Sequence, residues 1–225
     1  MKKTILNLVL AVNAAVACAP HGHAAPPGPD GLARIQLRGI DHALARPGAD
    51  LGRYLRIRLE QPIDISFDKN WRPTRTGSTL DLRPQDRDRI RNGLAEVLGE
   101  AFRQALTQTG KQGQPGYALT DEEGPDVLSV RVAVVDLSVT APDTNAPGRA
   151  RVYTVSTGEA TLRAELVDSL SGTVLARFID HREARNPGGS LELADSLRNR
   201  AEAERVASAW ARILRNYLDT ARAAR

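Results

Sequence analysis

The sequence has a single cysteine, Cys18, in 225 residues, so the chain cannot form an internal disulfide. Aromatic residues make up only 4% of the chain, and a folded core must therefore consist mainly of leucine, valine, isoleucine and alanine. After the first twenty residues, no apolar run is long enough to cross a bilayer as a helix. These absences predict one domain with an aliphatic core, and they leave the amino terminus as the place of any membrane attachment.

The motifs of common catalytic and metal sites are also missing. The sequence contains no Gly-x-Ser-x-Gly nucleophile elbow, no His-Glu zinc-protease motif and no glycine-rich phosphate loop followed by lysine. His21 and His23 form a His-x-His pair that could bind copper or nickel, although a linker that happens to contain two histidines is the commoner case. The acids of 121–126 lack the alternating spacing of a calcium loop. We therefore predict no cofactor, no metal site and no enzymatic activity.

The best cluster for acid–base chemistry is Asp180–Glu183, with the sequence Asp-His-Arg-Glu, at the end of an expected strand. His181 could act there if a neighbouring carboxylate oriented its ring. Successive strand residues point to opposite faces, however, so Asp180 and His181 would not face each other. A solvated strand end is the simpler interpretation, and a periplasmic hydrolase or glycan-modifying enzyme that uses acids near Asp180 and Glu183 is the alternative.

Residues 1–17 have the features of a bacterial secretion signal. Lys2 and Lys3 form its positive region, and Ile5–Ala17 is an apolar segment too short for an ordinary transmembrane helix. Removing these two of the 31 basic residues leaves 29 against 27 acidic ones. The remaining excess is slight and the arginines are mixed with acids, so no nucleic-acid-binding surface is predicted.

The three residues before Cys18, Ala-Val-Ala, resemble a bacterial lipobox, in which the cysteine is lipidated and becomes the first mature residue. Ala15 stands where a lipobox usually has leucine, which departs from the usual pattern. We predict a lipid on Cys18 that attaches the protein to a membrane. The alternative is an ordinary signal, cut after Ala17, Ala24 or Ala25, which would release a soluble periplasmic or secreted protein.

The chain divides into a signal at 1–17, a tether and weakly ordered lead-in at 18–49, and a single domain at 50–222. Ala24–Gly31 is rich in proline and glycine, and such a segment can hold a domain away from a membrane. The residue after Cys18 would be Ala19 rather than aspartate, which resembles lipoproteins sent to the outer membrane. The predicted location is therefore the periplasmic side of the outer membrane.

Apolar periodicity predicts the strands of the domain. Tyr54–Phe67 alternates as one long strand, which Pro62 places at a sheet edge or bends. Val127–Val139 is a second strand, and its apolar residues change parity in a way that suggests a β-bulge near Val134–Asp136. Gly158–Asp180 is typical of a hairpin.

Two amphipathic helices complete the pattern. Their apolar spacings of three, four and seven predict one helix from Pro84 to a left-handed cap at Gly110, and another from Ser196. The simplest arrangement is an α+β fold, with a mainly antiparallel sheet of about four or five strands and two amphipathic helices packed on one face.

A resemblance to a known family is carried by the segments PGADLGRYLRIRLEQPIDI, GPDVLSVRVAVVDL, STGEATLRAELVDSLSGTVLARFIDHREA and NRAEAERVASAWARIL. They resemble an uncharacterised family of proteobacterial lipoproteins, domain of unknown function thirty-three thirteen, over roughly Ala49 to Leu218. Its most specific parts are the Gly158–Leu162 strand, the Asp168–Gly172 turn and the Trp210 helix. The resemblance implies export and, usually, a lipid anchor, and it assigns no reaction.

These observations favour an exported, lipid-anchored module that binds an envelope protein or other envelope component without catalysing a reaction. The hydrolase alternative stands second. A third hypothesis is a structural lipoprotein that assembles with itself by adding the Tyr54–Phe67 edge strand to a neighbour, although Pro62 argues against it. The sequence leaves the partner and the oligomeric state open.

Overall fold

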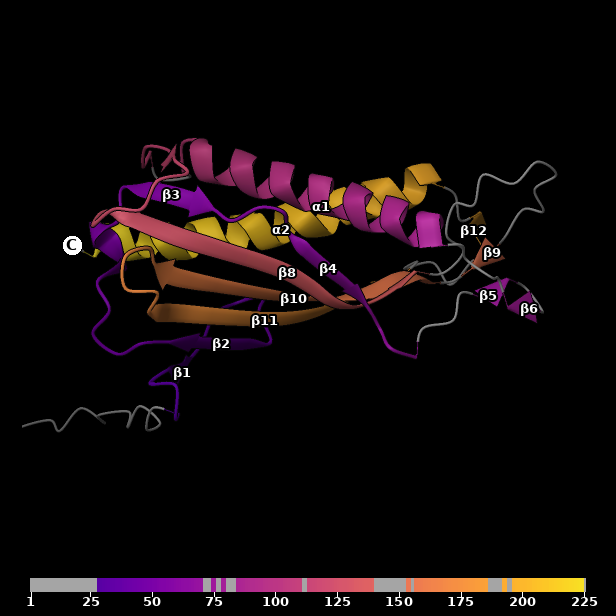
Figure 1. Cartoon of the computed structure of the whole chain (residues 1–225), viewed down its shortest axis with the longest axis horizontal. Coiled ribbons are helices and arrows are strands. Elements are labelled where there is room, and N and C mark those ends of the chain that lie inside the picture. Colours follow the sequence, from indigo (N-terminus) through magenta and orange to yellow (C-terminus); the bar gives the residue numbers. More distant parts are fainter. Residues whose placement is uncertain are drawn as a thin grey trace, which may run out of the picture.

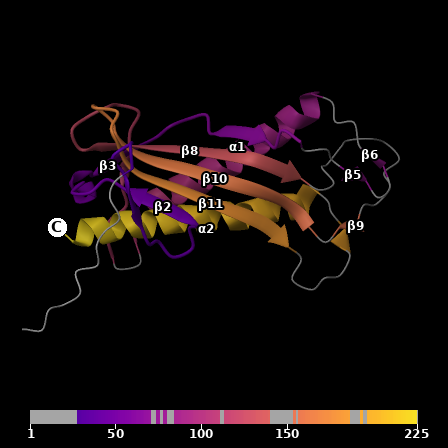
Figure 2. The ribbon, with the colours of Figure 1, turned by 90° about the horizontal axis from the view of Figure 1, so that it is seen from below.

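The computed structural model describes residues 28–70, 74–75, 78–79, 84–110, 113–139, 153–154, 156–185, 192–193 and 196–224. In this part of the chain, one mixed sheet of eight strands is accompanied by two long helices (Figure 1). The helices α1 (Pro84–Thr107) and α2 (Ser196–Ala223) pack together and lie on the same side of the sheet (Figure 2). The predicted α+β class and both helices are therefore confirmed.

The middle of the sheet consists of three long antiparallel strands. They are β8 (Val127–Val139), β10 (Ser156–Asp168) and β11 (Val174–Arg185). The predicted hairpin is formed by β10 and β11, with Gly172 in the turn at a φ of 67° that favours glycine. Beyond β11 the sheet continues, again antiparallel, with β2 (His42–Ala45) and β1 (Ala33–Ile35). The sheet thus extends into the segment that was expected to be a lead-in.

The other side of the sheet is parallel. Strands β3 (Arg56–Leu59) and β4 (Asp64–Phe67) both pair with β8, and β7 (Ala118–Leu119) pairs with β3. The prediction of a mainly antiparallel sheet with four or five strands is therefore wrong in strand number and misses the parallel pairs. The parallel pairs arise because the chain passes through α1 between β4 and β8, and a long crossover of this kind allows two strands to run in the same direction.

The segment expected as one long strand is two strands that share β8 as their neighbour. Pro62 lies in the break between β3 and β4, where its lack of an N–H donor costs no ladder hydrogen bond.

Small elements complete the described chain, namely η1 (Leu51–Arg53) and the pairs β5 (Thr74–Arg75) with β6 (Ser78–Thr79) and β9 (Tyr153–Thr154) with β12 (Glu192–Leu193).

The predicted β-bulge is confirmed. Asp136 has a φ of 53°, and between Val135 and Ser138 strand β8 has one residue more than its partner β10. The extra residue restores the inward parity, so that Val134 and Leu137 are both buried.

The core lies between the inner face of the sheet and the helices, and it is mainly aliphatic, as the composition predicts. Its largest fully buried side chains are Phe102, Phe178, Ile57, Ile65, Leu98, Leu106, Leu128, Leu166 and Leu218. No helix of the described chain is long and apolar enough to cross a membrane.

Candidate functional site

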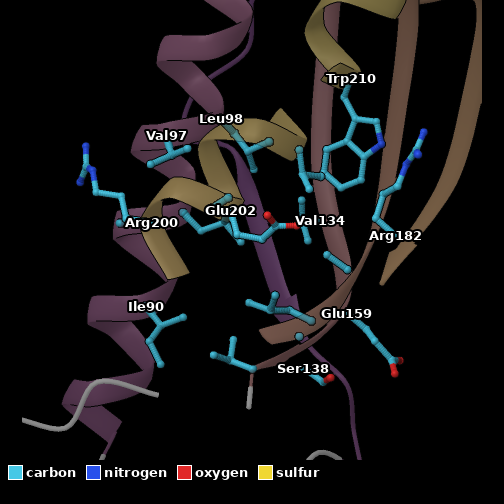
Figure 3. Close-up of a pocket in the computed structure, with 18 of the residues that line it drawn as sticks. Ile90, Val97, Leu98, Val134, Ser138, Glu159, Arg182, Arg200, Glu202 and Trp210 are labelled. Carbon is cyan, nitrogen blue, oxygen red and sulfur yellow. The ribbon is translucent and has the colours of Figure 1, made fainter. Parts of the chain in front are cut away.

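A cavity of about 370 Å³ lies between the first halves of both helices and the sheet, at the end where β8 stops and β10 begins (Figure 3). This volume is within the range of small-molecule binding sites. Its walls are aliphatic, and the side chains that form them are Ile90, Leu94, Val97, Leu98, Val134, Leu137, Val139, Ala160, Ala203 and Val206.

The rim of the cavity carries charges of both signs. Arg89, Arg182 and Arg200 contribute positive groups, and Glu159 and Glu202 contribute carboxylates. All five side chains are at least partly exposed. The cavity therefore has an apolar interior and a polar, solvent-facing mouth, an arrangement that suits a ligand with one apolar and one polar part.

Two glycines shape this end of the fold. Gly158 has a φ of 147°, and a Cβ atom there would lie 2.4 Å from the carbonyl oxygen of Ser138, so only glycine fits between β10 and β8. Gly93 lines the cavity from α1, and a Cβ atom there would meet nothing within 4 Å. The backbone at Gly93 thus borders open space rather than a tightly packed neighbour.

Trp210 closes the inner end of the cavity. Its indole Nε1 donates a hydrogen bond to Oδ2 of Asp180 at 2.7 Å, and both side chains are buried. The Asp180 carboxylate also accepts from the backbone N–H of Asp41 at 3.1 Å and from Nε of Arg182 at 2.5 Å. Three donors hold this carboxylate in place, so its role here is to fix Trp210 and strand β11.

The predicted acid–base cluster does not form a site. Asp180 is on the inner face of β11, whereas His181 and Glu183 are exposed on the strand. Nδ1 of His181 lies 3.1 Å from the hydroxyl of Thr161, and no carboxylate orients this ring among the contacts of the described chain. The prediction that Asp180 and His181 do not face each other is confirmed, and Asp180 and Glu183 do not converge on one cavity.

The carboxyl group with the most strongly lowered pKa is that of Asp168, the last residue of β10, at the opposite end of this strand from the cavity. Oδ2 of Asp168 accepts from the Tyr54 hydroxyl at 2.7 Å and from the Arg53 guanidinium at 2.6 Å, while Oδ1 accepts from Ser171 N–H at 2.8 Å. These hydrogen bonds hold the pKa of Asp168 well below its usual range. Burial is the main cause that raises the pKa of Tyr54 to about 12. This cluster joins η1 to the hairpin, and its residues are not among those that line the cavity described above.

The lipid site and the possible metal-binding pair predicted from the sequence are not part of the described chain. Cys18, His21 and His23 lie outside the described residues. Within the described ranges, no group of three or more His, Cys, Asp or Glu is placed to hold a metal ion. The cavity is not predicted from the sequence; the predicted helix contains two glycines, Gly93 and Gly99, and of these Gly93 lines the cavity.

Comparison with known proteins gives a family and distant structural likenesses. The family model described as "Protein of unknown function (DUF3313)" matches residues 41–214. No curated protein matches the chain. Among solved structures, the PelC dodecamer from Paraburkholderia phytofirmans aligns at 9% identity, over 77% of this chain and 96% of that one, with a TM-score of 0.37. A Xanthomonas campestris protein of family DUF330 aligns at 13% identity, over 73% and 83%, with a TM-score of 0.39.

Proposed function

We propose that this chain, which belongs to the DUF3313 family of proteins of unknown function, is an exported, lipid-anchored envelope protein that acts as a non-enzymatic binding or assembly module. The main observation that supports a binding role is the aliphatic cavity, whose charged residues lie at its mouth. Such a cavity supplies burial for an apolar group, which is what a binding module needs.

Catalysis has less support from the same geometry. A glycan hydrolase of the usual kind needs two carboxyl groups that flank one bond. At the cavity mouth, Oε2 of Glu202 accepts from Nε of Arg205 at 2.9 Å, and Figure 3 shows the Glu159 carboxylate directed away from Glu202. Asp180 is occupied by its three donors. Glu159, Glu202 and Asp180 therefore do not form the pair of carboxylates that this chemistry needs.

Assembly through the Tyr54–Phe67 strand edge has less support as well. Strand β3 has neighbours on both sides, β8 and β7, over Arg56 and Ile57. In β4, the carbonyl oxygen of Ile65 accepts a hydrogen bond from Nε of Arg91 at 3.1 Å. These contacts shorten the edge that the segment could offer to a second chain, and binding through the cavity is the preferred hypothesis.

Intact masses of the wild type and of Cys18→Ala, measured on membrane and soluble fractions from a bacterial host, test the anchor. We expect the wild type to begin at Cys18 with added acyl mass, and the variant to lose that mass. A wild type that begins at Ala24, Ala25 or Pro26 and stays in the soluble fraction would contradict the lipid anchor.

A further inference from the structure

We infer that the cavity binds one aliphatic chain of an amphiphile, with the polar head of the amphiphile at the charged rim. This inference names a ligand class for the proposed binding module, and it does not depend on whether Cys18 carries a lipid. The walls, the rim and Gly93 each support it.

The walls match a hydrocarbon chain rather than a polar or aromatic ligand. Ten aliphatic side chains line the interior, and the one aromatic residue, Trp210, already donates its only N–H group to Asp180. The polar side chains of the lining, Ser138 and the five charged residues, all reach solvent. A ligand that enters between them finds apolar contacts and no free hydrogen-bonding group of Trp210, so a polar group placed inside would lose its water without replacement.

The charged residues at the rim indicate how much the charge of the head group contributes to binding. Arginines and glutamates stand there together, and several are already paired on the surface, as Arg200 is with Glu204 at 2.9 Å. Exposed pairs of this kind contribute little and rearrange easily. The charge of the head is therefore a minor determinant, and the aliphatic chain is the part that is recognised.

Gly93 leaves the cavity open, although glycine at this position makes helix α1 less stable than alanine would. Glycine is less favourable than alanine inside a helix, and here no neighbouring atom requires it, because a Cβ atom would meet nothing within 4 Å. A larger side chain at this position would project into the cavity and reduce its volume. The cavity of about 370 Å³ has room for an aliphatic chain and opens to solvent at its rim, where the polar head would lie.

The test uses the full-length chain with Cys18→Ala, purified without detergent, and with Trp71→Phe so that Trp210 is its only tryptophan. The probe is lauroyl lysophosphatidylethanolamine below its micelle concentration, followed by Trp210 fluorescence and by native mass spectrometry. We expect saturable binding of one molecule per chain. Binding should weaken about fourfold for each methylene removed from the acyl chain, and dodecanoate and dodecyltrimethylammonium should bind within about fivefold of each other.

A matched pair of variants at Gly93 assigns the binding to the cavity. Gly93→Leu fills the volume and should weaken binding by at least about tenfold, because it displaces several methylenes of the ligand. Gly93→Ala leaves most of the volume open and should bind as the parent does. Ala203→Leu, on the facing helix, repeats the test in case Gly93→Leu fails to fold, and cooperative unfolding followed by circular dichroism is the control for each variant.

Three outcomes would overturn the inference. The first is no saturable binding by a parent protein that unfolds cooperatively, and the second is equal binding by Gly93→Leu, Gly93→Ala and Ala203→Leu. The third is a parent dimer, seen by size exclusion with light scattering, that Gly93→Leu dissociates, because the cavity would then be a contact between two copies. The mass of the wild type at Cys18 is measured separately, so failure of the anchor and failure of the ligand are distinguishable.

Discussion

The indole N–H of Trp210 in α2 donates to the buried carboxylate of Asp180 in β11 at a distance of 2.7 Å. This hydrogen bond joins the second helix to the sheet at the inner end of the cavity. Asp180 also accepts from the backbone N–H of Asp41, so one carboxylate connects the helix, the hairpin and the loop that precedes β2.

Asp180→Ala should therefore be strongly destabilising. The substitution leaves the Trp210 and Asp41 donors unpaired, and we expect the free energy of unfolding to fall by about 3 kcal/mol. Urea denaturation of the full-length chain measures this difference. Arg163→Ala, an exposed position on the neighbouring strand β10, is the control and should change stability by less than about 0.5 kcal/mol. Equal effects of the two substitutions would show that the Asp180 hydrogen bonds contribute no stability.

The Asp168 cluster predicts a defined dependence of stability on acid. The pKa of Asp168 is lower in the folded chain than the value of about 3.9 for an unfolded aspartate. Ionised Asp168 thus stabilises the folded state above that pH, and this contribution is lost progressively as the pH falls below it. Asp168→Asn should lower the free energy of unfolding by about 2 kcal/mol near neutral pH.

The pH profile separates this electrostatic effect from a packing effect. The difference between wild type and Asp168→Asn should shrink as the pH falls below about 4, because the Asp168 carboxyl of the unfolded wild type then binds a proton while that of the folded chain stays ionised. Chemical denaturation at several pH values measures the difference. Tyr54→Phe, which removes one donor to Asp168, should reduce the wild-type acid dependence only in part. A difference that stays constant from neutral to acid pH would contradict the assigned cause.

Local features of this fold are well predicted from the sequence, and long-range features are not. The parity change in Val127–Val139 gives the bulge at Asp136, and the period of Ser196–Ala223 gives α2, because both patterns are written in adjacent residues. The parallel pairing of β3 and β4 with β8 depends on where the chain returns to the sheet after the crossover through α1. No local sequence pattern predicts that position. The cavity depends on what two helices and a sheet leave unfilled, which the sequence does not predict.

The end of α1 is another feature that depends on a residue distant in the sequence. Gly110 was predicted to cap this helix in the left-handed conformation, but the helix ends at Thr107 and Gly110 is not among the glycines with positive φ. The cap comes instead from Arg215 of α2, whose guanidinium donates to the carbonyl oxygens of Leu106 at 2.6 Å and Gln108 at 2.8 Å. A cap that lies more than a hundred residues away in the chain leaves no local signal.

Arg215 is itself buried, and its replacement should be costly. Its guanidinium also contacts Asp219 at 2.8 Å, so Arg215→Leu leaves both a buried carboxylate and the last carbonyls of α1 without their donor. We expect a loss of about 3–5 kcal/mol, and Arg215→Lys should rescue little of it because one ammonium cannot replace the planar set of donors. Thermal unfolding measures the loss, and the exposed Arg212→Ala is the control. Full rescue by lysine would show that only the charge matters.

Two glycine-to-alanine substitutions should change stability in opposite directions. Gly93→Ala adds a methyl group in open space inside a helix, so it should stabilise the chain by about 0.5–1 kcal/mol through helix propensity. Gly116→Ala places a Cβ atom 1.8 Å from the carbonyl oxygen of Thr107, so the backbone must shift and stability should fall by about 2 kcal/mol or more. Urea denaturation of both variants in the same full-length background measures the two effects. If Gly93→Ala destabilised the chain, the space beside α1 would be needed by the fold itself, and retention of the cavity for a ligand would lose its main argument.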